Sequence, residues 1–151
     1  FQLNHRVLVF HSYLLFIREM NFNPQFETIG NALIEHYYRL FDVGDPNIRA
    51  QGLHDLYDAE NSYMTFEGVQ VKGREQILEK FKGLTFKSIQ RAITKSDCQP
   101  LYDGSILVSV LGQLKTDEDP VQSYNQLFIL RPNATGFFIA NEMFRLVLHN
   151  M

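Results

Sequence analysis

Residues 105–131, SILVSVLGQLKTDEDPVQSYNQLFILR, contain two apolar strand-like runs separated by a short acidic turn. The turn, Asp117-Glu118-Asp119-Pro120, joins the run 105–116 to the run 121–131. Asp and Pro favour turns, so this segment predicts an antiparallel hairpin. The three consecutive carboxylates at its tip are either a solvated turn or a fixed negative patch that meets a basic partner.

Two further strand-like runs flank this hairpin, at residues 86–98 and 137–148. Turn signals separate them from it at Asp103-Gly104 and at residues 133–136. Because the connections between the four runs are short, the runs predict an antiparallel meander. A long sheet of this kind twists strongly and can curl around a helix.

Helices are predicted mainly in the first half of the chain. Asn23-Pro24 predicts a helix start, with Asn as the cap and Pro in the first turn, and apolar residues then recur at helical spacing as far as Phe41. Asp45-Pro46 predicts a second, shorter helix, and Arg74–Lys82 a third. Residues 63–71 between them read as a hairpin that turns at Glu67-Gly68. We therefore expect an α+β domain in which a long, curved antiparallel sheet wraps around N-terminal helices to form a cone.

The last strand-like run is apolar on both of its expected faces. Simple alternation places five apolar residues on one face, namely Phe138, Ala140, Phe144, Leu146 and Leu148. It places four on the other, namely Phe137, Ile139, Met143 and Val147. A sheet that is apolar on both sides in a small chain indicates a homodimer formed through the outer sheet face.

The composition narrows the class of partner. The chain has 151 residues, enough for one domain, and a net charge of −3 without a basic cluster, which argues against nucleic acid as the main partner. The single cysteine, Cys98, cannot form an internal disulfide and fits a reducing compartment such as cytosol or nucleus. The five histidines show no metal-ligand spacing, and no glycine-rich phosphate loop occurs. We expect neither a metal nor a cofactor.

Residues 1–19 differ in character from the rest of the sequence. They contain short apolar runs interrupted by His11 and Ser12, which are too short and too polar for a membrane span. We expect this segment to be a non-conforming leader, disordered or not native, although an amphipathic N-terminal anchor is an alternative. The single domain is then expected to comprise residues 20–151.

Four segments occur together in an order that is far more specific than any one of them. They are residues 36–42 (HYYRLFD), 65–68 (TFEG), 112–120 (GQLKTDEDP) and 143–150 (MFRLVLHN). With these segments the chain resembles the nuclear transport factor 2 family, from about Phe22 to Asn150. The resemblance implies a cone-shaped homodimer with the nuclear transport factor 2-like, or cystatin-like, fold.

The resemblance also implies a function. It implies a carrier, not an enzyme, that takes GDP-bound Ran into the nucleus and also binds the phenylalanine-glycine repeats of nucleoporins. Such a protein is expected in cytoplasm and nucleus, enriched at the nuclear envelope and pore, without contact with membrane lipid.

The implied Ran site combines an acidic rim with a hydrophobic cavity that receives an aromatic side chain of Ran. The rim positions are Glu67, Asp117 and Asp119. The positions that match the cavity lining are Phe66, Leu84, Ile89, Leu127 and Phe144. An aromatic anchor in a dry pocket with charged pairs around it is a common hot-spot arrangement. Without the resemblance, these apolar residues would be assigned to plain core packing.

A second implied site, for nucleoporin repeats, centres on Phe26. The family commonly has Trp at this position and at that of Phe66, whereas this chain contains no Trp. Phe keeps the apolar face but loses contact area and the indole N–H. The alternative role for Phe26 is a hydrophobic staple that fixes the entry of the first helix.

Two other functions are open on the same fold. A small-molecule isomerase or dehydratase would use Tyr37, Tyr38, Tyr57 and Asp58 around the cavity. A binding module of the same fold would pair with a larger mRNA-export partner or recruit proteins. The set of rim carboxylates favours the Ran carrier over that module.

Overall fold

The computed structural model describes residues 21–148, which contain three α-helices and six strands. The helices are α2 (Phe26–Phe41), α3 (Pro46–Leu53) and α4 (Arg74–Lys82), with short 3-10 helices η1 (His54–Leu56) and η2 (Tyr102–Gly104). The strands are β1 (Tyr63–Phe66), β2 (Val69–Lys72), β3 (Ile89–Pro100), β4 (Ile106–Thr116), β5 (Gln122–Asn133) and β6 (Gly136–Leu146). The predicted leader, residues 1–19, lies outside the described residues, so its separation from the domain stays a prediction.

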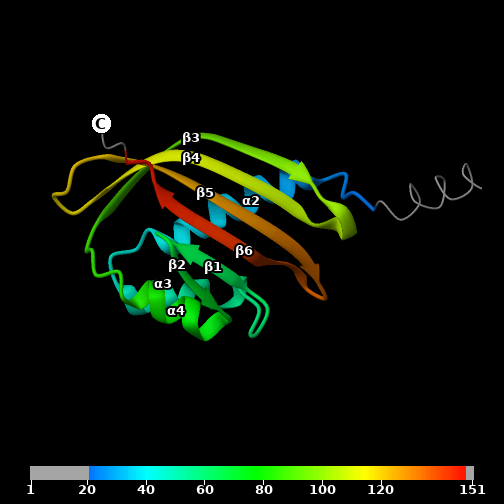
Figure 1. The fold of residues 1–151 in the computed structure, drawn as a ribbon, viewed down its shortest axis with the longest axis horizontal. Coiled ribbons are helices and arrows are strands. Elements are labelled where there is room, and N and C mark those ends of the chain that lie inside the picture. The colour runs from blue at the N-terminus through cyan, green and yellow to red at the C-terminus, as the bar shows by residue number, and fades with distance from the viewer. Residues whose placement is uncertain (1–20, 149–151) are drawn as a thin grey trace, which may run out of the picture.

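All six strands form one sheet in the order β2-β1-β6-β5-β4-β3. Strands β3 to β6 are the predicted antiparallel meander. The sequence did not reveal that β1 runs parallel to β6, with Phe66 paired to Phe144, which makes the sheet mixed. In Figure 1 the long strands curve over α2, while α3, α4 and the hairpin β1–β2 gather near one end of the sheet.

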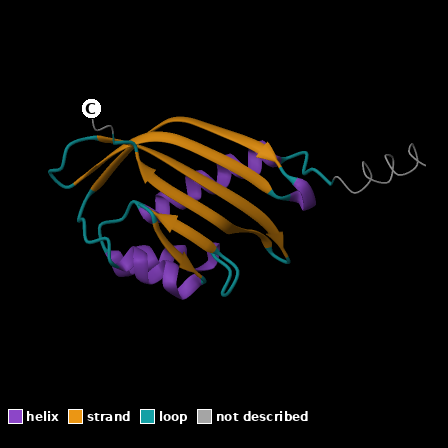
Figure 2. Cartoon of the chain, viewed as in Figure 1, coloured by secondary structure: helices purple, strands orange, loops and turns teal. Residues whose placement is uncertain are grey.

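Helix α2 lies along one face of the sheet, as Figure 2 shows. Its buried residues recur at helical spacing and include Gly30, Ile34, Tyr37 and Phe41. Gly30 permits close packing on the sheet, because a Cβ there would lie 2.6 Å from the Cys98 Sγ. The predicted α+β cone, a curved sheet wrapped around an N-terminal helix, is confirmed.

The start of the first helix differs from the prediction. Helix α2 begins at Phe26 with Gln25 at the N-cap position, two residues later than expected. Asn23 instead closes a turn before the helix, since its Oδ1 accepts a hydrogen bond from the Gln25 N–H at 2.8 Å. The second start is confirmed, because the Asp45 Oδ1 accepts from the Asn47 N–H at 2.8 Å.

A bulge in β6 overturns the predicted assignment of its two faces. Ile129 pairs with Asn141 and Leu130 with Ile139, so Ala140 is an extra residue between two pairs. The extra residue reverses the alternation, so that Ile139 and Phe144 both face the core. Phe138, expected beside Phe144, pairs with Arg131 in the part of β6 that precedes the bulge.

The sheet face opposite α2, called the outer face here, is covered by no element within residues 21–148. Its strands expose apolar side chains, with Leu111 45% and Met143 51% accessible. Leu127 pairs with Met143 across β5 and β6 and belongs to the same face. None of the helices in this part of the chain has the length and apolarity needed to cross a bilayer.

Candidate functional site

A cavity of about 170 Å³ lies where the C-terminal end of α2 meets the hairpin β1–β2 and the ends of β4 to β6. Its apolar lining includes Phe41, Phe66, Leu84, Phe86, Ile89 and Phe144. The Phe66 and Phe144 rings stack at 4.6 Å between centroids. The parallel pairing of β1 with β6 brings these two rings together, so a contact that the sequence did not reveal builds one wall of the cavity.

Four of the five residues assigned to the cavity from the sequence line it, namely Phe66, Leu84, Ile89 and Phe144. The assignment of Leu127 was wrong. Tyr124, Gln126 and Phe128 of β5 are buried toward the core, so alternation along the strand places Leu127 on the outer face. Gln126, which precedes it, is the lining residue on this strand.

Glu67 lies at the rim of the cavity, in the turn between β1 and β2. Glu67 and Gly68 both have positive φ, 48° and 82°, as a tight two-residue hairpin turn requires. The Glu67 N–H donates to the Phe144 carbonyl at 3.0 Å, and its carboxylate accepts from the Leu146 N–H. The carboxylate is therefore fixed against β6 while Glu67 lines the cavity.

The acidic tip, residues 117–119, lies beside the same cavity. The Asp117 Oδ1 accepts hydrogen bonds from the N–H groups of Lys87 at 2.9 Å and Ser88 at 3.0 Å. These backbone donors, that of Ser88 foremost, lower the pKa of Asp117. The Asp119 N–H donates to the Thr116 carbonyl at 3.0 Å. Thr116 lines the cavity, so the tip directly follows the lining.

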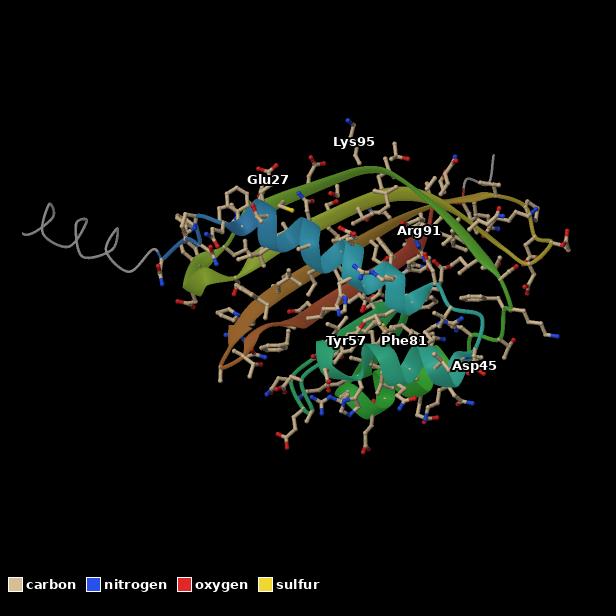
Figure 3. All side chains as sticks on the ribbon, turned by 180° about the vertical axis from the view of Figure 1, so that it is seen from behind. Glu27, Asp45, Tyr57, Phe81, Arg91 and Lys95 are labelled. Atoms are coloured by element: carbon tan, nitrogen blue, oxygen red, sulfur yellow. The ribbon has the colours of Figure 1, made fainter. Side chains whose placement is uncertain are left out.

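The sequence did not identify Arg91 as a residue of the site, although alternation along β3 places it on the same face as Ile89. Its side chain is only 6% accessible and lines the cavity, where it pairs with Asp42 at 2.8 Å between Nη2 and Oδ1. Its guanidinium lies 4.2 Å from the Tyr38 ring centroid. Burial alone would lower the pKa of Arg91, but the Asp42 carboxylate raises it above its ordinary value. Figure 3 shows Arg91 at the C-terminal end of α2, where Asp42 caps that helix.

A buried carboxylate, that of Glu142, lies next to the cavity, because its hydrogen-bond partners Tyr37 and Gln126 line the cavity. Glu142, 1% accessible, accepts hydrogen bonds from the hydroxyls of Tyr37 and Tyr57, each at 2.6 Å, and from the Gln126 Nε2 at 2.7 Å. Burial raises the pKa of Glu142, and the three hydrogen bonds oppose this shift in part. The Tyr38 hydroxyl donates to the Gln126 Oε1 at 2.8 Å and completes the network. The one signal for Glu142 in the sequence is that alternation along β6 places it on the same face as Phe144.

Of the four residues of the enzyme alternative, Tyr37 lines the cavity, whereas Tyr38, Tyr57 and Asp58 do not. The hydroxyls of Tyr37 and Tyr57 are bound to Glu142 in the core. Asp58 does not line the cavity and instead accepts from the Asn61 N–H at 2.8 Å in an exposed turn. Within the described residues, no group of three or more His, Cys, Asp or Glu could hold a metal ion.

Phe26 is the first residue of α2 and packs against the edge of the core. It does not line the cavity, whose α2 residues are Tyr37 and Phe41 near the other end of the helix. At a rise of about 1.5 Å per residue, the predicted repeat site is separated from the cavity by most of the helix length.

Comparisons with known proteins agree with this architecture. The family model of the nuclear transport factor 2 domain matches residues 29–146. A probable nuclear transport factor 2 from Caenorhabditis elegans is 67% identical over 132 residues, which cover 87% of this chain and 99% of the relative. Nuclear transport factor 2 of Oryza sativa subsp. japonica is 39% identical over 123 residues, 80% of this chain and 95% of that protein.

A solved structure is similar over nearly its full length. Nuclear transport factor 2 from Cryptosporidium parvum matches with a TM-score of 0.77 at 36% identity and covers 85% of this chain and 99% of that one. These three proteins are named as transport factors and not as enzymes. The chain therefore belongs to the nuclear transport factor 2 family, whose named members indicate a role in nuclear transport.

Proposed function

We propose that this protein carries GDP-bound Ran into the nucleus and that an aromatic side chain of Ran enters the cavity. The observation that carries the proposal is one apolar cavity that has Glu67 in its lining and the acidic tip directly beside it. A dry cavity of about 150 Å³ accepts benzene in other proteins, so a volume of about 170 Å³ suits one aromatic ring.

The fixed carboxylates supply the specificity. Within residues 21–148, neither Glu67 nor Asp117 forms a salt bridge. Their positions are nevertheless set by backbone N–H donors, those of Leu146 for Glu67 and of Lys87 and Ser88 for Asp117. Preorganised negative charge at a rim attracts a basic surface and disfavours other partners. A switch segment whose conformation depends on the nucleotide would make binding specific for the GDP form.

We propose two further interactions for the same carrier. A second copy of the chain covers the outer face, where Leu111 and Met143 are half exposed, and forms a homodimer. Phenylalanine-glycine repeats of nucleoporins bind around Phe26. Such a carrier works in cytoplasm and nucleus and concentrates at the nuclear pore.

Capture of purified Ran by the full chain tests the main proposal. We expect capture of GDP-loaded Ran and little of GTP-loaded Ran. Glu67→Gln and Asp117→Asn remove a charge yet keep an oxygen for the backbone donors, and we expect Glu67→Gln to weaken capture about tenfold or more. Glu60→Gln, an exposed charge in the turn after Asp58, is the matched control and should bind normally. Equal capture of both nucleotide forms, or full capture by the two rim variants, would contradict the proposal.

The repeat site is tested separately. Phe26→Ala should lose retention on immobilised phenylalanine-glycine repeats while it still captures GDP-loaded Ran, because Phe26 lies outside the cavity. Retention of the variant equal to that of the wild type would show that Phe26 does not bind the repeats and only packs against the core. A staple is excluded, because Phe26 follows the N-cap Gln25.

A further inference from the structure

One wall of the cavity is neither helix nor strand. Residues 84–88, called the wall segment here, connect α4 to β3, and their side chains Leu84 and Phe86 line the cavity. An irregular segment has no ladder of its own hydrogen bonds to fix it, so its shape depends on what holds its backbone.

A side chain of α3, Arg49, binds the backbone of the wall segment. It is fully buried in α3, and its Nη1 donates to the Leu84 carbonyl at 2.8 Å. Its Nε and Nη2 donate to the carbonyls of Phe41 at 2.8 Å and Val43 at 2.6 Å, at the end of α2. The guanidinium lies 4.1 Å from the Phe86 ring centroid. One side chain therefore links the wall segment to the C-terminal end of α2.

This environment is unusual for a buried cation, because no carboxylate forms a salt bridge with Arg49 among the described residues. Its partners are backbone carbonyls, and Nη1 also reaches the carbonyl of Phe81 near the end of α4 at 3.4 Å. Carbonyls at helix C-terminal ends lack intrahelical partners and carry partial negative charge. The planar fork of an arginine can bind several such carbonyls at once, which a lysine cannot match.

The other side of the wall segment is also fixed. Asp117 binds the N–H groups of Lys87 and Ser88, as described above. Gly44 packs directly on the segment, because a Cβ at this glycine would lie 2.2 Å from the Lys87 carbonyl oxygen. The backbone of the segment is thus held at Leu84 by Arg49, at Lys87 by Gly44 and at residues 87–88 by Asp117.

We propose that Arg49 is a positioning residue for the cavity: it sets the wall segment so that the cavity is open before any partner arrives. The proposal deepens the proposed function, because a preformed cavity spares the partner the cost of ordering the segment on binding. Arg49 acts through Leu84 and Phe86 and does not itself line the cavity.

The test uses the full chain with Arg49→Met and Arg49→Lys, and with Leu53→Ala as the matched control. Leu53 is fully buried on the same helix and does not line the cavity. Its variant therefore loses stability but keeps the hydrogen bond from Arg49 to the Leu84 carbonyl. Two readouts need no protein partner. They are xenon binding, followed by NMR, and amide hydrogen exchange of Lys87 and Ser88.

We expect xenon to shift the methyl resonances of Leu84 and Ile89, which line the cavity, alike in wild type and Leu53→Ala, since apolar cavities of this size take it up. Xenon in the new cavity left by the Leu53 side chain would not count, because that cavity lies elsewhere. Arg49→Met should bind xenon about tenfold or more weakly and exchange the two amides about tenfold faster. Arg49→Lys, which keeps the charge but not the fork, should fall between them. Weakened capture of GDP-loaded Ran should follow the same order.

The proposal would be overturned if Arg49→Met bound xenon as tightly as the wild type does. It would also be overturned if the Lys87 and Ser88 amides of this variant exchanged as slowly as those of the wild type. If Arg49→Met does not fold, Arg49→Lys decides: effects no larger than those of Leu53→Ala would show that Arg49 is a general support of the core. Absence of xenon binding in the wild type would also overturn it. If the wild type captures no Ran, the proposed function fails, while xenon and exchange still decide the role of Arg49.

Discussion

Replacing Glu142 with glutamine removes one titrating group from the protein interior and should change how stability depends on pH. Glu142 is 1% accessible and accepts hydrogen bonds from Tyr37, Tyr57 and Gln126. Glutamine has nearly the same shape, and its amide can accept from one tyrosine hydroxyl and donate to the other. The variant is therefore expected to fold and to differ from the wild type mainly in the proton that it cannot bind.

The sign follows from the direction of the pKa shift. Burial raises the pKa of Glu142 above its ordinary value of 4.5, so the folded protein retains this proton at a pH where the unfolded chain has released it. The stabilisation from this proton is fully present below pH 4.5 and is lost as the pH rises through the folded pKa. Over that interval the free energy of unfolding falls by up to about 1.4 kcal/mol per pH unit for one proton.

Urea denaturation of the wild type and Glu142→Gln at a series of pH values measures this effect. The free energy of unfolding of the variant minus that of the wild type should increase as the pH rises above 4.5 and then level off. Other titrating groups are common to both proteins and cancel in the difference. A difference that decreases with rising pH would mean that the hydrogen bonds dominate and lower the pKa of Glu142, which would refute the reasoning.

Three further outcomes are expected. Met143→Glu places a charge on the outer face and should convert a dimer into a monomer by light scattering, whereas a persisting dimer would exclude this face as the interface. Gly112→Ala brings a Cβ to 2.8 Å from both the Ala92 carbonyl oxygen and the Tyr124 ring and should cost about 1–3 kcal/mol in urea denaturation; an unchanged midpoint would show that both groups can move. Asp45→Ala removes the N-cap of α3 and should cost about 1 kcal/mol in the same assay, and no loss would show that the cap is dispensable.

Local signals in the sequence predicted the elements well. Asp45-Pro46 marks the start of α3, Glu67-Gly68 the turn of the first hairpin, and the bounds of α4 agree residue by residue. Each of these signals depends on the conformational preferences of a few neighbouring residues, so it needs no knowledge of distant contacts.

The faces of the strands were predicted less well, because alternation carries information only while the register is unbroken. The extra residue Ala140 exchanges the faces along β6, and nothing in its identity indicates a bulge. Leu127 was assigned to the cavity by resemblance, although its buried neighbours Gln126 and Phe128 define the inner face of β5. A polar residue at an inner position, as Gln126 is, conceals such a pattern.

The buried charges were not predicted. Arg49 and Glu142 bind groups that are distant in the sequence, such as the Leu84 carbonyl for Arg49 and the Tyr37 hydroxyl for Glu142. Their charge alone would place both at the surface, since charged residues are rarely buried without partners. Their partners become visible only when α2, α3 and the sheet are assembled.

Methyl NMR of the full chain during addition of GDP-loaded Ran tests the central claim most directly, because it reports where the partner binds. The cavity contains the methyl groups of Leu84 and Ile89, while those of Leu127 lie on the outer face. Insertion of an aromatic ring should shift the Leu84 and Ile89 resonances strongly through ring currents and leave those of Leu127 unchanged. Shifts at Leu127 with none at Leu84 and Ile89 would contradict the account.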